Sequence, residues 1–171
     1  KVEGNAVGFE VLRSASQYLS KFPNQIALVF AADSWLCPAR LEALDLSGRL
    51  HSVNNSWGFA PGEGAAVIAL ATGKTAQKYG LEPLGRLESV AVAEEHKTLG
   101  TETVCIGEGL TSAFRSTLTT DSLISHSYCD LNGETYRADE FGFTVCRTSR
   151  FFEDASRFTA GAQCWGDVGA A

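Results

Sequence analysis

The chain has 171 residues, of which 44% are hydrophobic and 20% charged, and its net charge of −6 gives a pI near 5.0. This composition is typical of a soluble globular protein, and we expect a single domain. Without a basic patch the chain is a poor candidate for nucleic-acid binding, and no apolar run approaches the roughly 20 residues that cross a bilayer. Its five cysteines are widely spaced and form no Cys-x-x-Cys pair, which favours reduced cytoplasmic thiols over a disulfide framework or a zinc site.

The first third of the chain predicts a helix followed by a buried strand. Apolar residues recur at helical spacing over 6–22, and Pro23 and Asn24 end that pattern. The apolar run 25–32 then reads as a buried strand, as in a parallel or mixed sheet. Residues 35–55 are rich in loop signals, with a short helix expected over 38–44.

The stretch 58–71 is the most distinctive part of the sequence. Its glycines and Pro61 lead into a run of small and apolar residues, which predicts a strand covered on both faces. Gly62 and Gly64 would let another backbone approach closely. Glu63 places one carboxylate in what we expect to be dry surroundings, where it needs a partner. A short helix or turn over 74–79 and a strand over 84–94 follow, and that strand would pair antiparallel with the strand after Gly62.

The remainder of the chain alternates helices and strands. Apolar spacing predicts a helix over 109–118, a strand over 122–128, a helix over 136–152 and a strand over 158–165. Residues 166–171 read as a turn from a strand into a helix. The chain contains no Met and stops at Gly169-Ala170-Ala171, so we expect the protein to continue beyond both ends.

Two segments resemble nucleotide-binding motifs but lack residues that those motifs require. The segment 71–75 ends like a P-loop, but the position of the leading glycine holds Ile68. The pattern Gly62-x-Gly64-x-x-Val67 lacks the third glycine of a dinucleotide fingerprint and leads into a strand instead of a helix. We therefore expect no organic cofactor, and no metal.

The pattern Gly-Phe-x-Pro-Gly-Glu-Gly-Ala-Ala at 58–66, followed by an apolar strand, resembles a segment late in the first half of β-ketoacyl synthases of the thiolase superfamily. The order of the expected elements matches as well. The resemblance implies a divergent, partial chain with an α/β, thiolase-like layered fold and mixed β-sheets, covering the middle and second half of that fold. Residues 1–96 would end the first half, and residues 97–171 would form part of the second.

The resemblance also implies positions for catalytic residues. These enzymes use a Cys nucleophile at a helix N-terminus and two His donors that stabilise the developing negative charge. Glu3 falls at the nucleophile position, unless the nucleophile precedes Lys1 or Glu3 is an ordinary residue of a first helical turn. The first His position falls on Cys129 or Asp130, and the second on Asp167. Two nearby aspartates could share a proton.

Other polar and aromatic residues complete the candidate site. The turn 130–137 carries four hydrogen-bonding side chains, among them Asn132 and Glu134, which suits either a substrate-binding loop or an Asx-type turn with a surface ion pair. Trp35 and Trp57 would line an acyl pocket, or else serve as core or interface aromatics.

Together these features predict a β-ketoacyl synthase-like protein that acts on thioester-linked acyl chains in fatty acid or polyketide biosynthesis. It would be an acyltransferase if active, with the usual Cys and His positions replaced. The alternative is a non-catalytic thiolase-fold partner of an active synthase, like a chain-length factor. A third hypothesis is a hydrolase or acyl transferase that uses Cys129 with Asp130. The resemblance implies acyl carrier protein or acyl-CoA as partner, and a homodimer or a heterodimer with a related synthase, with the strand 25–32 near its interface.

Overall fold

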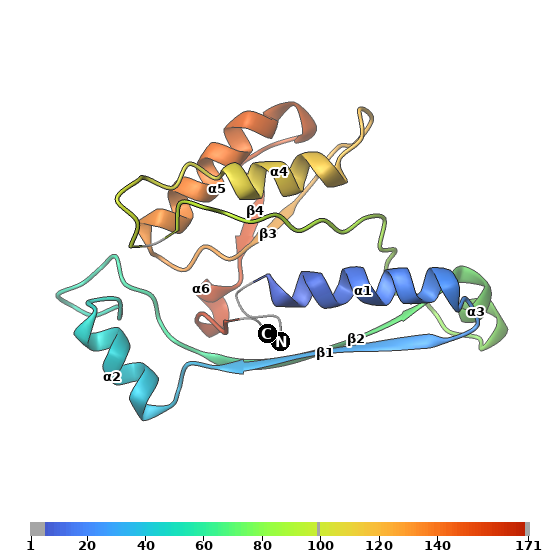
Figure 1. Ribbon diagram of the computed structural model, residues 1–171, viewed down its shortest axis with the longest axis horizontal. Coiled ribbons are helices and arrows are strands. Elements are labelled where there is room, and N and C mark those ends of the chain that lie inside the picture. The colour runs from blue at the N-terminus through green and yellow to red at the C-terminus, as the bar shows by residue number, and fades with distance from the viewer. Residues whose placement is uncertain (1–5, 99, 170–171) are drawn as a thin grey trace. The chain divides into compact units, whose positions relative to one another are not determined.

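The computed structural model describes residues 6–98 and 100–169, and helices and short strands follow one another along them (Figure 1). The elements in chain order are α1 (Val7–Lys21), β1 (Ile26–Ser34), α2 (Pro38–Leu46), β2 (Glu63–Ala71), α3 (Gly73–Lys78), α4 (Glu108–Thr117), β3 (Ser127–Cys129), α5 (Thr135–Thr148), the 3-10 helix η1 (Ser149–Phe151), β4 (Phe158–Ala160) and α6 (Ala162–Trp165). Within these residues, no helix combines the length and the apolar character that a membrane span requires.

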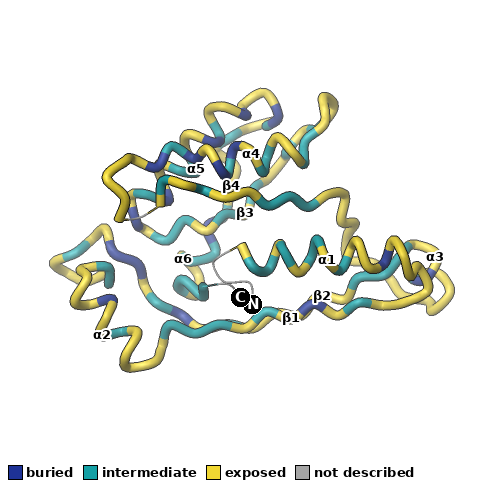
Figure 2. The backbone as a smooth tube through the Cα atoms, viewed as in Figure 1, coloured by how far each residue is buried: buried dark blue, intermediate teal, exposed yellow. Residues whose placement is uncertain are grey.

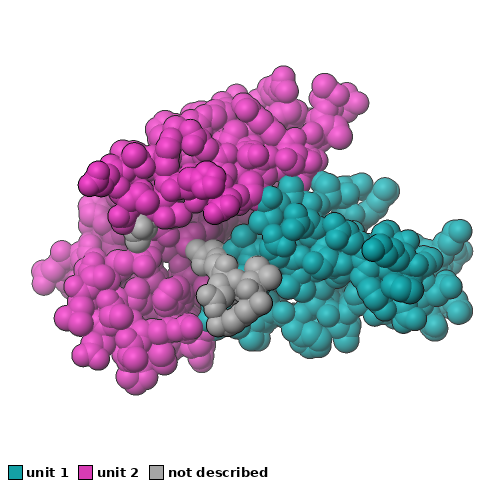
Figure 3. Space-filling view, viewed as in Figure 1, with its two compact units in different colours: residues 1–33, 64–92, 170–171 teal, residues 34–63, 93–169 magenta. Residues whose placement is uncertain are grey.

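The described residues form two compact units, which Figure 3 distinguishes by colour. One unit contains residues 6–33 and 64–92, and the other contains residues 34–63, 93–98 and 100–169. The division into a first and a second half at residue 96 stays a prediction.

The first unit combines α1 and α3 with most of β1 and β2. The hydroxyls of Thr72 and Thr75, beyond the end of β2, donate to the carbonyl oxygen of Pro23, just before β1, at 2.8 and 2.6 Å. The end of one strand thus lies beside the start of the other, so the two neighbouring strands run in opposite directions (Figure 1). Thr72 also caps α3, because its side chain accepts from the backbone N–H of Thr75.

Two expectations for this unit are wrong. Residues 84–94 form no strand, and β2 pairs with β1 instead. Pro83 precedes that stretch and Gly85 interrupts it, and its alternation at three apolar positions is too weak to define a strand. Cover on both faces is the second wrong expectation, because the described residues add no second layer over these strands (Figure 2). In β1, Val29 is buried but Leu28 and Phe30 are exposed, and in β2, for which the sequence predicts cover on both faces, Val67 and Ile68 are exposed.

The second unit contains a parallel pair of strands joined through α5. Ser127 lies opposite Phe158, Tyr128 opposite Thr159, and Cys129 opposite Ala160. A parallel pair requires a long crossover connection, which α5 and η1 supply. Helix α4 packs on α5 through buried threonines: the hydroxyls of Thr111 and Thr144 lie 3.3 Å apart. These small side chains bring the two helices close together.

Both predicted strands of this unit are shorter than expected. The segment 122–126 contributes a single bridge, between Ile124 and Phe152, before β3 begins. The strand predicted over 158–165 ends at Ala160, and the remainder turns into α6, whose Trp165 is exposed. The apolar character of residues 162–165 suggested a buried strand, but Gly161 starts a helical turn in which its carbonyl oxygen accepts from the N–H of Cys164.

The glycine-rich entry to β2 pairs with the turn at residues 166–167. The backbone N–H of Asp167 donates to the carbonyl oxygen of Ala60, and the N–H of Gly62 donates to the carbonyl oxygen of Asp167, each at 2.8 Å. A Cβ at Gly62 would lie only 2.5 Å from the carbonyl oxygen of Trp165, so the predicted close approach of another backbone is confirmed there. The expected dry surroundings of Glu63 are wrong, since its carboxylate is exposed and accepts from the hydroxyl of Ser34.

Candidate functional site

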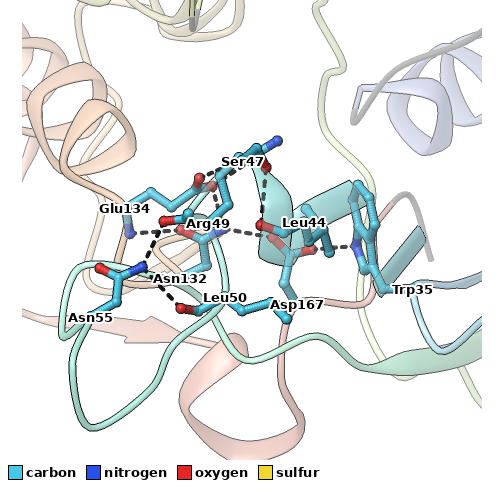
Figure 4. A network of polar contacts seen from close by, with 10 residues as sticks. Trp35, Leu44, Ser47, Arg49, Leu50, Asn55, Asn132, Glu134 and Asp167 are labelled. Atoms are coloured by element: carbon cyan, nitrogen blue, oxygen red, sulfur yellow. Dashed lines mark hydrogen bonds and ion pairs between the residues drawn. The ribbon is translucent and has the colours of Figure 1, made fainter. Parts of the chain in front are cut away.

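Five side chains of the second unit form one continuous set of hydrogen bonds, shown in Figure 4. We call this set the Asp167 network; its members are Trp35, Arg49, Asn132, Glu134 and Asp167. They come from the loop after β1, the loop after α2, the turn before α5 and the turn after α6. Four of the eight predicted site residues therefore meet in one place, although they span more than 130 positions of the chain.

One end of the network is a bidentate ion pair. Arg49 Nε and Nη2 donate to the two carboxylate oxygens of Glu134 at 2.7 and 2.9 Å. The Glu134 side chain is 8% exposed and that of Arg49 is 30% exposed. The hydrogen bond to Glu134 raises the pKa of Arg49, against the opposing effect of burial. The guanidinium also lies over the ring of the fully buried Phe59, with 5.4 Å between its central carbon and the ring centroid.

Asn132 joins the two acids of the network. Its amide nitrogen donates to Glu134 at 3.1 Å and to Asp167 at 2.7 Å, and its amide oxygen accepts from the backbone N–H of Glu134 at 3.0 Å. This is the Asx turn that the sequence suggested, and it leads directly into α5. The ion pair expected with this turn forms between Asp130, whose side chain is 63% exposed, and Arg137, whose side chain is 8% exposed. Gly133 has φ of +108°, and a Cβ there would meet the carbonyl oxygen of Gly58 at 2.8 Å, so only glycine fits this turn.

Asp167 is the acceptor at the other end. Trp35 Nε1 donates to one carboxylate oxygen at 3.3 Å and the backbone N–H of Gly169 donates to the same oxygen at 2.8 Å, while Asn132 donates to the other. Three N–H groups therefore converge on this carboxylate. The turn is fixed from both sides, because Gly166 adopts φ of +78° and the backbone of Asp167 is bonded to residues 60 and 62.

Asp130 lies outside this network. It forms an ion pair with Arg137, whose side chain is 8% exposed, whereas the Asp130 side chain is 63% exposed. Arg137 Nε is buried and, among the residues that the structure describes, has no hydrogen-bond partner. The described contacts include no hydrogen bond between Asp130 and Asp167, and each carboxylate has its own donors.

The other three predicted site residues are not part of the network. Cys129 ends β3, and its thiol donates to the carbonyl oxygen of Thr159 at 3.7 Å. Burial raises the pKa of this thiol, and the charge of Asp130 raises it further. Trp57 is 69% exposed on a loop. Glu3 lies outside the described residues.

A second cluster carries side chains of the kinds that bind metals. Glu95, Cys105 and Glu140 each place a ligand atom within 4.8 Å of the others. Glu95 has a structural role already, because its carboxylate accepts from the backbone N–H groups of Gly109 and Lys97 at 2.9 and 3.0 Å and so caps α4. Burial raises the pKa of both Cys105 and Glu140, which favours their neutral forms. The cluster is therefore explained as a helix cap beside two groups whose charged forms burial disfavours.

Comparisons with known proteins find solved structures of similar fold. No protein-family model and no curated protein sequence matches the chain. One similar solved structure, AntDE:AntF, is described as a type II polyketide synthase acyl-carrier protein in complex with its ketosynthase bound to the hexaketide; the TM-score is 0.75 at 15% identity. Another is a β-ketoacyl synthase from Burkholderia phymatum, with a TM-score of 0.63 at 14% identity. Each match covers 98% of this chain, but only 45% and 43% of those chains respectively. The chain thus has a ketosynthase-like mixed α/β fold and spans less than half the length of these structures.

Proposed function

We propose that the chain is part of a β-ketoacyl synthase-like protein that binds thioester-linked acyl chains and lacks the usual imidazole-based condensation. The acyl chain would arrive on an acyl carrier protein or as acyl-CoA. The ketosynthase-like fold supports the substrate class, and so does the similarity to AntDE:AntF, in which a ketosynthase is in complex with an acyl-carrier protein.

The observation that carries the proposal is the set of donors around Asp167. Condensation requires N–H groups directed at an oxygen that gains negative charge in the transition state. The resemblance assigns Asp167 to a His position, and an ionised carboxylate can only accept hydrogen bonds. Here Asn132, Trp35 and the N–H of Gly169 already donate to that carboxylate. A developing oxyanion at this place would meet a negative charge instead of free donors.

The properties of Cys129 argue against a thiol-based hydrolase or acyl transferase. A reactive cysteine needs a lowered pKa, supplied by a nearby cation or a helix N-terminus. Burial raises the pKa of Cys129, and Asp130 beside it acts in the same direction. The thiol form therefore predominates at neutral pH, and the thiol is a weak nucleophile. The nucleophile position stays assigned by resemblance to Glu3.

A condensation assay tests the proposal. The protein would be incubated with hexanoyl- and malonyl-acyl carrier protein, and the products would be identified by mass spectrometry. We expect no chain-extended product from the protein or from the variants Asp167→Asn and Arg86→Gln, the second being a control at a residue whose side chain is 83% exposed. Chain extension by the protein that Asp167→Asn abolishes and Arg86→Gln retains would overturn the proposal.

The second candidate function is a non-catalytic partner of an active synthase. The same network favours it, because hydrogen bonds that are satisfied within the protein stabilise a fold without requiring a substrate. The two candidates differ in one property: the proposed protein binds an acyl thioester by itself, whereas a partner protein changes the rate or the product length of a related synthase without binding the thioester.

A further inference from the structure

A polar groove lies on the second unit, separate from the Asp167 network. It has a volume of about 370 Å³ and is open to solvent. We call it the α4 groove; it is lined by Glu108, Thr111, Ser112, Arg115, Ser116 and Arg147. Five of these residues belong to α4 and the last to α5, so the groove follows the contact between the two helices.

The sequence of α4 explains why the groove is open and polar. The apolar side of the helix faces inward, where Phe114 stacks against Phe152 with ring centroids 6.3 Å apart. Ser112 and Ser116 are one helical turn apart on the other side, with Arg115 next to them, and all three are exposed. Their small side chains leave space that larger residues would fill. The Ser116 hydroxyl donates to the carbonyl oxygen of Ser112 at 2.9 Å, so the donor that the serines offer to the groove is the Ser112 hydroxyl.

Arg147 is held in place on the opposite wall. Its guanidinium donates to the carbonyl oxygen of Ile106 and, at 3.4 Å, to the hydroxyl of Thr111. It also lies over the ring of Phe143, with 5.6 Å between its central carbon and the ring centroid. A guanidinium that is fixed before binding loses less side-chain entropy when a ligand arrives.

The charges of the groove favour an anion. Glu108 is the one acid among the lining residues, and its carboxylate is engaged by Lys97 Nζ at 3.1 Å. Arg115 forms no ion pair within the described ranges 6–98 and 100–169. Two guanidiniums therefore line one groove without a carboxylate that neutralises them, although the whole chain carries a net charge of −6.

We propose that the α4 groove binds a phosphoryl group. Forked guanidinium donors match the oxygens of a phosphate, and the Ser112 hydroxyl supplies a further donor to a tetrahedral dianion. The phosphoryl group comes either from free phosphate or from an organic phosphate monoester. This proposal does not depend on the proposed acyl-thioester function.

Nuclear magnetic resonance titration tests it at constant low ionic strength. Inorganic phosphate and glycerol 3-phosphate would be added separately, with glycerol as the uncharged control, and backbone amide shifts of α4 would be followed. The test variant is Arg115→Gln, because Arg147 also supports the fold. The control is Arg86→Gln, which removes an equally charged but 83% exposed side chain from the ion pair with Glu88. We expect saturable shifts at Ser112 and Ser116, a dissociation constant about tenfold higher in Arg115→Gln, and no change in Arg86→Gln.

Each result supports or overturns the proposal that the α4 groove binds a phosphoryl group. Binding of free phosphate supports the free anion as ligand, whereas binding of glycerol 3-phosphate alone supports a monoester. The proposal is overturned if glycerol shifts the same amides as glycerol 3-phosphate, or if both arginine variants weaken binding equally. It is also overturned if neither phosphate gives saturable shifts in α4.

Discussion

Removal of Arg49 should destabilise the second unit strongly. In Arg49→Ala, Glu134, whose side chain is 8% exposed in the intact pair, loses both guanidinium hydrogen bonds. Breaking a buried ion pair from one side typically costs 3–5 kcal/mol, because the remaining charge is left without its partner. Here Asn132 still donates to Glu134, and Arg49 is 30% exposed. We therefore expect a loss of about 2–3 kcal/mol in the free energy of unfolding.

Urea unfolding at neutral pH measures this loss, with Arg86→Ala as the matched control. Arg86 pairs with Glu88 at 3.0 Å, but both side chains are largely exposed, so its removal should cost less than about 0.5 kcal/mol. The double variant Arg49→Ala/Glu134→Gln should recover part of the loss, because a neutral amide is less costly to leave buried than a carboxylate. Equal losses in Arg49→Ala and Arg86→Ala would refute the assignment of the pair as a buried structural element.

Three further predictions concern other parts of the second unit. Gly166→Ala should lower the free energy of unfolding by about 1–2 kcal/mol in urea, because the residue has φ of +78° and the new Cβ would lie 2.9 Å from a carbonyl oxygen. The control is Gly142→Ala, inside α5, where no heavy atom lies within 4 Å of the new Cβ, so this change should be neutral or stabilising. Burial raises the pKa of Glu140, so its contribution to stability is present below the ordinary Glu pKa of 4.5 and is lost as pH rises through the folded-state pKa. Glu140→Gln should therefore gain stability relative to the unmodified protein as the pH of the urea unfolding is raised above 4.5, and a constant difference would contradict the burial of this carboxylate. Because its pKa is raised, Cys129 should react with iodoacetamide more slowly than the exposed Cys37 at neutral pH. Peptide mass mapping measures the two labelling rates, and faster labelling of Cys129 would support the thiol-based hydrolase or acyl transferase.

The sequence predicted the elements whose signals are local. The apolar spacing over 6–22 and the stop at Pro23 place α1 within a residue at each end, and the apolar run from Gln25 places β1. The glycines and Pro61 before β2 predicted a close backbone contact, which the structure shows at Gly62. The signals for these features are local in the sequence, although the backbone that Gly62 admits belongs to the distant Trp165.

The predictions that were wrong or missing concern contacts between residues that lie far apart in the sequence. Nothing around Arg49 signals that it pairs with Glu134, 85 positions later, and its loop reads as an ordinary polar connection. The alternation over 84–94 suggested a strand, but β2 found its partner in β1. Residues 162–165 are apolar enough for a strand, yet the turn at Gly161 converts them into α6. In each of these places, a contact with a distant segment or a local turn determines the structure, and the apolar pattern alone does not.

Binding of an acyl thioester by the protein alone tests the central proposal most directly. Hexanoyl-CoA would be titrated into the protein in a calorimeter, with CoA as the matched ligand that lacks the acyl chain. The account predicts saturable binding of hexanoyl-CoA that is clearly tighter than that of CoA. Equal affinity for the two ligands, or no binding of either, would contradict a site for thioester-linked acyl chains.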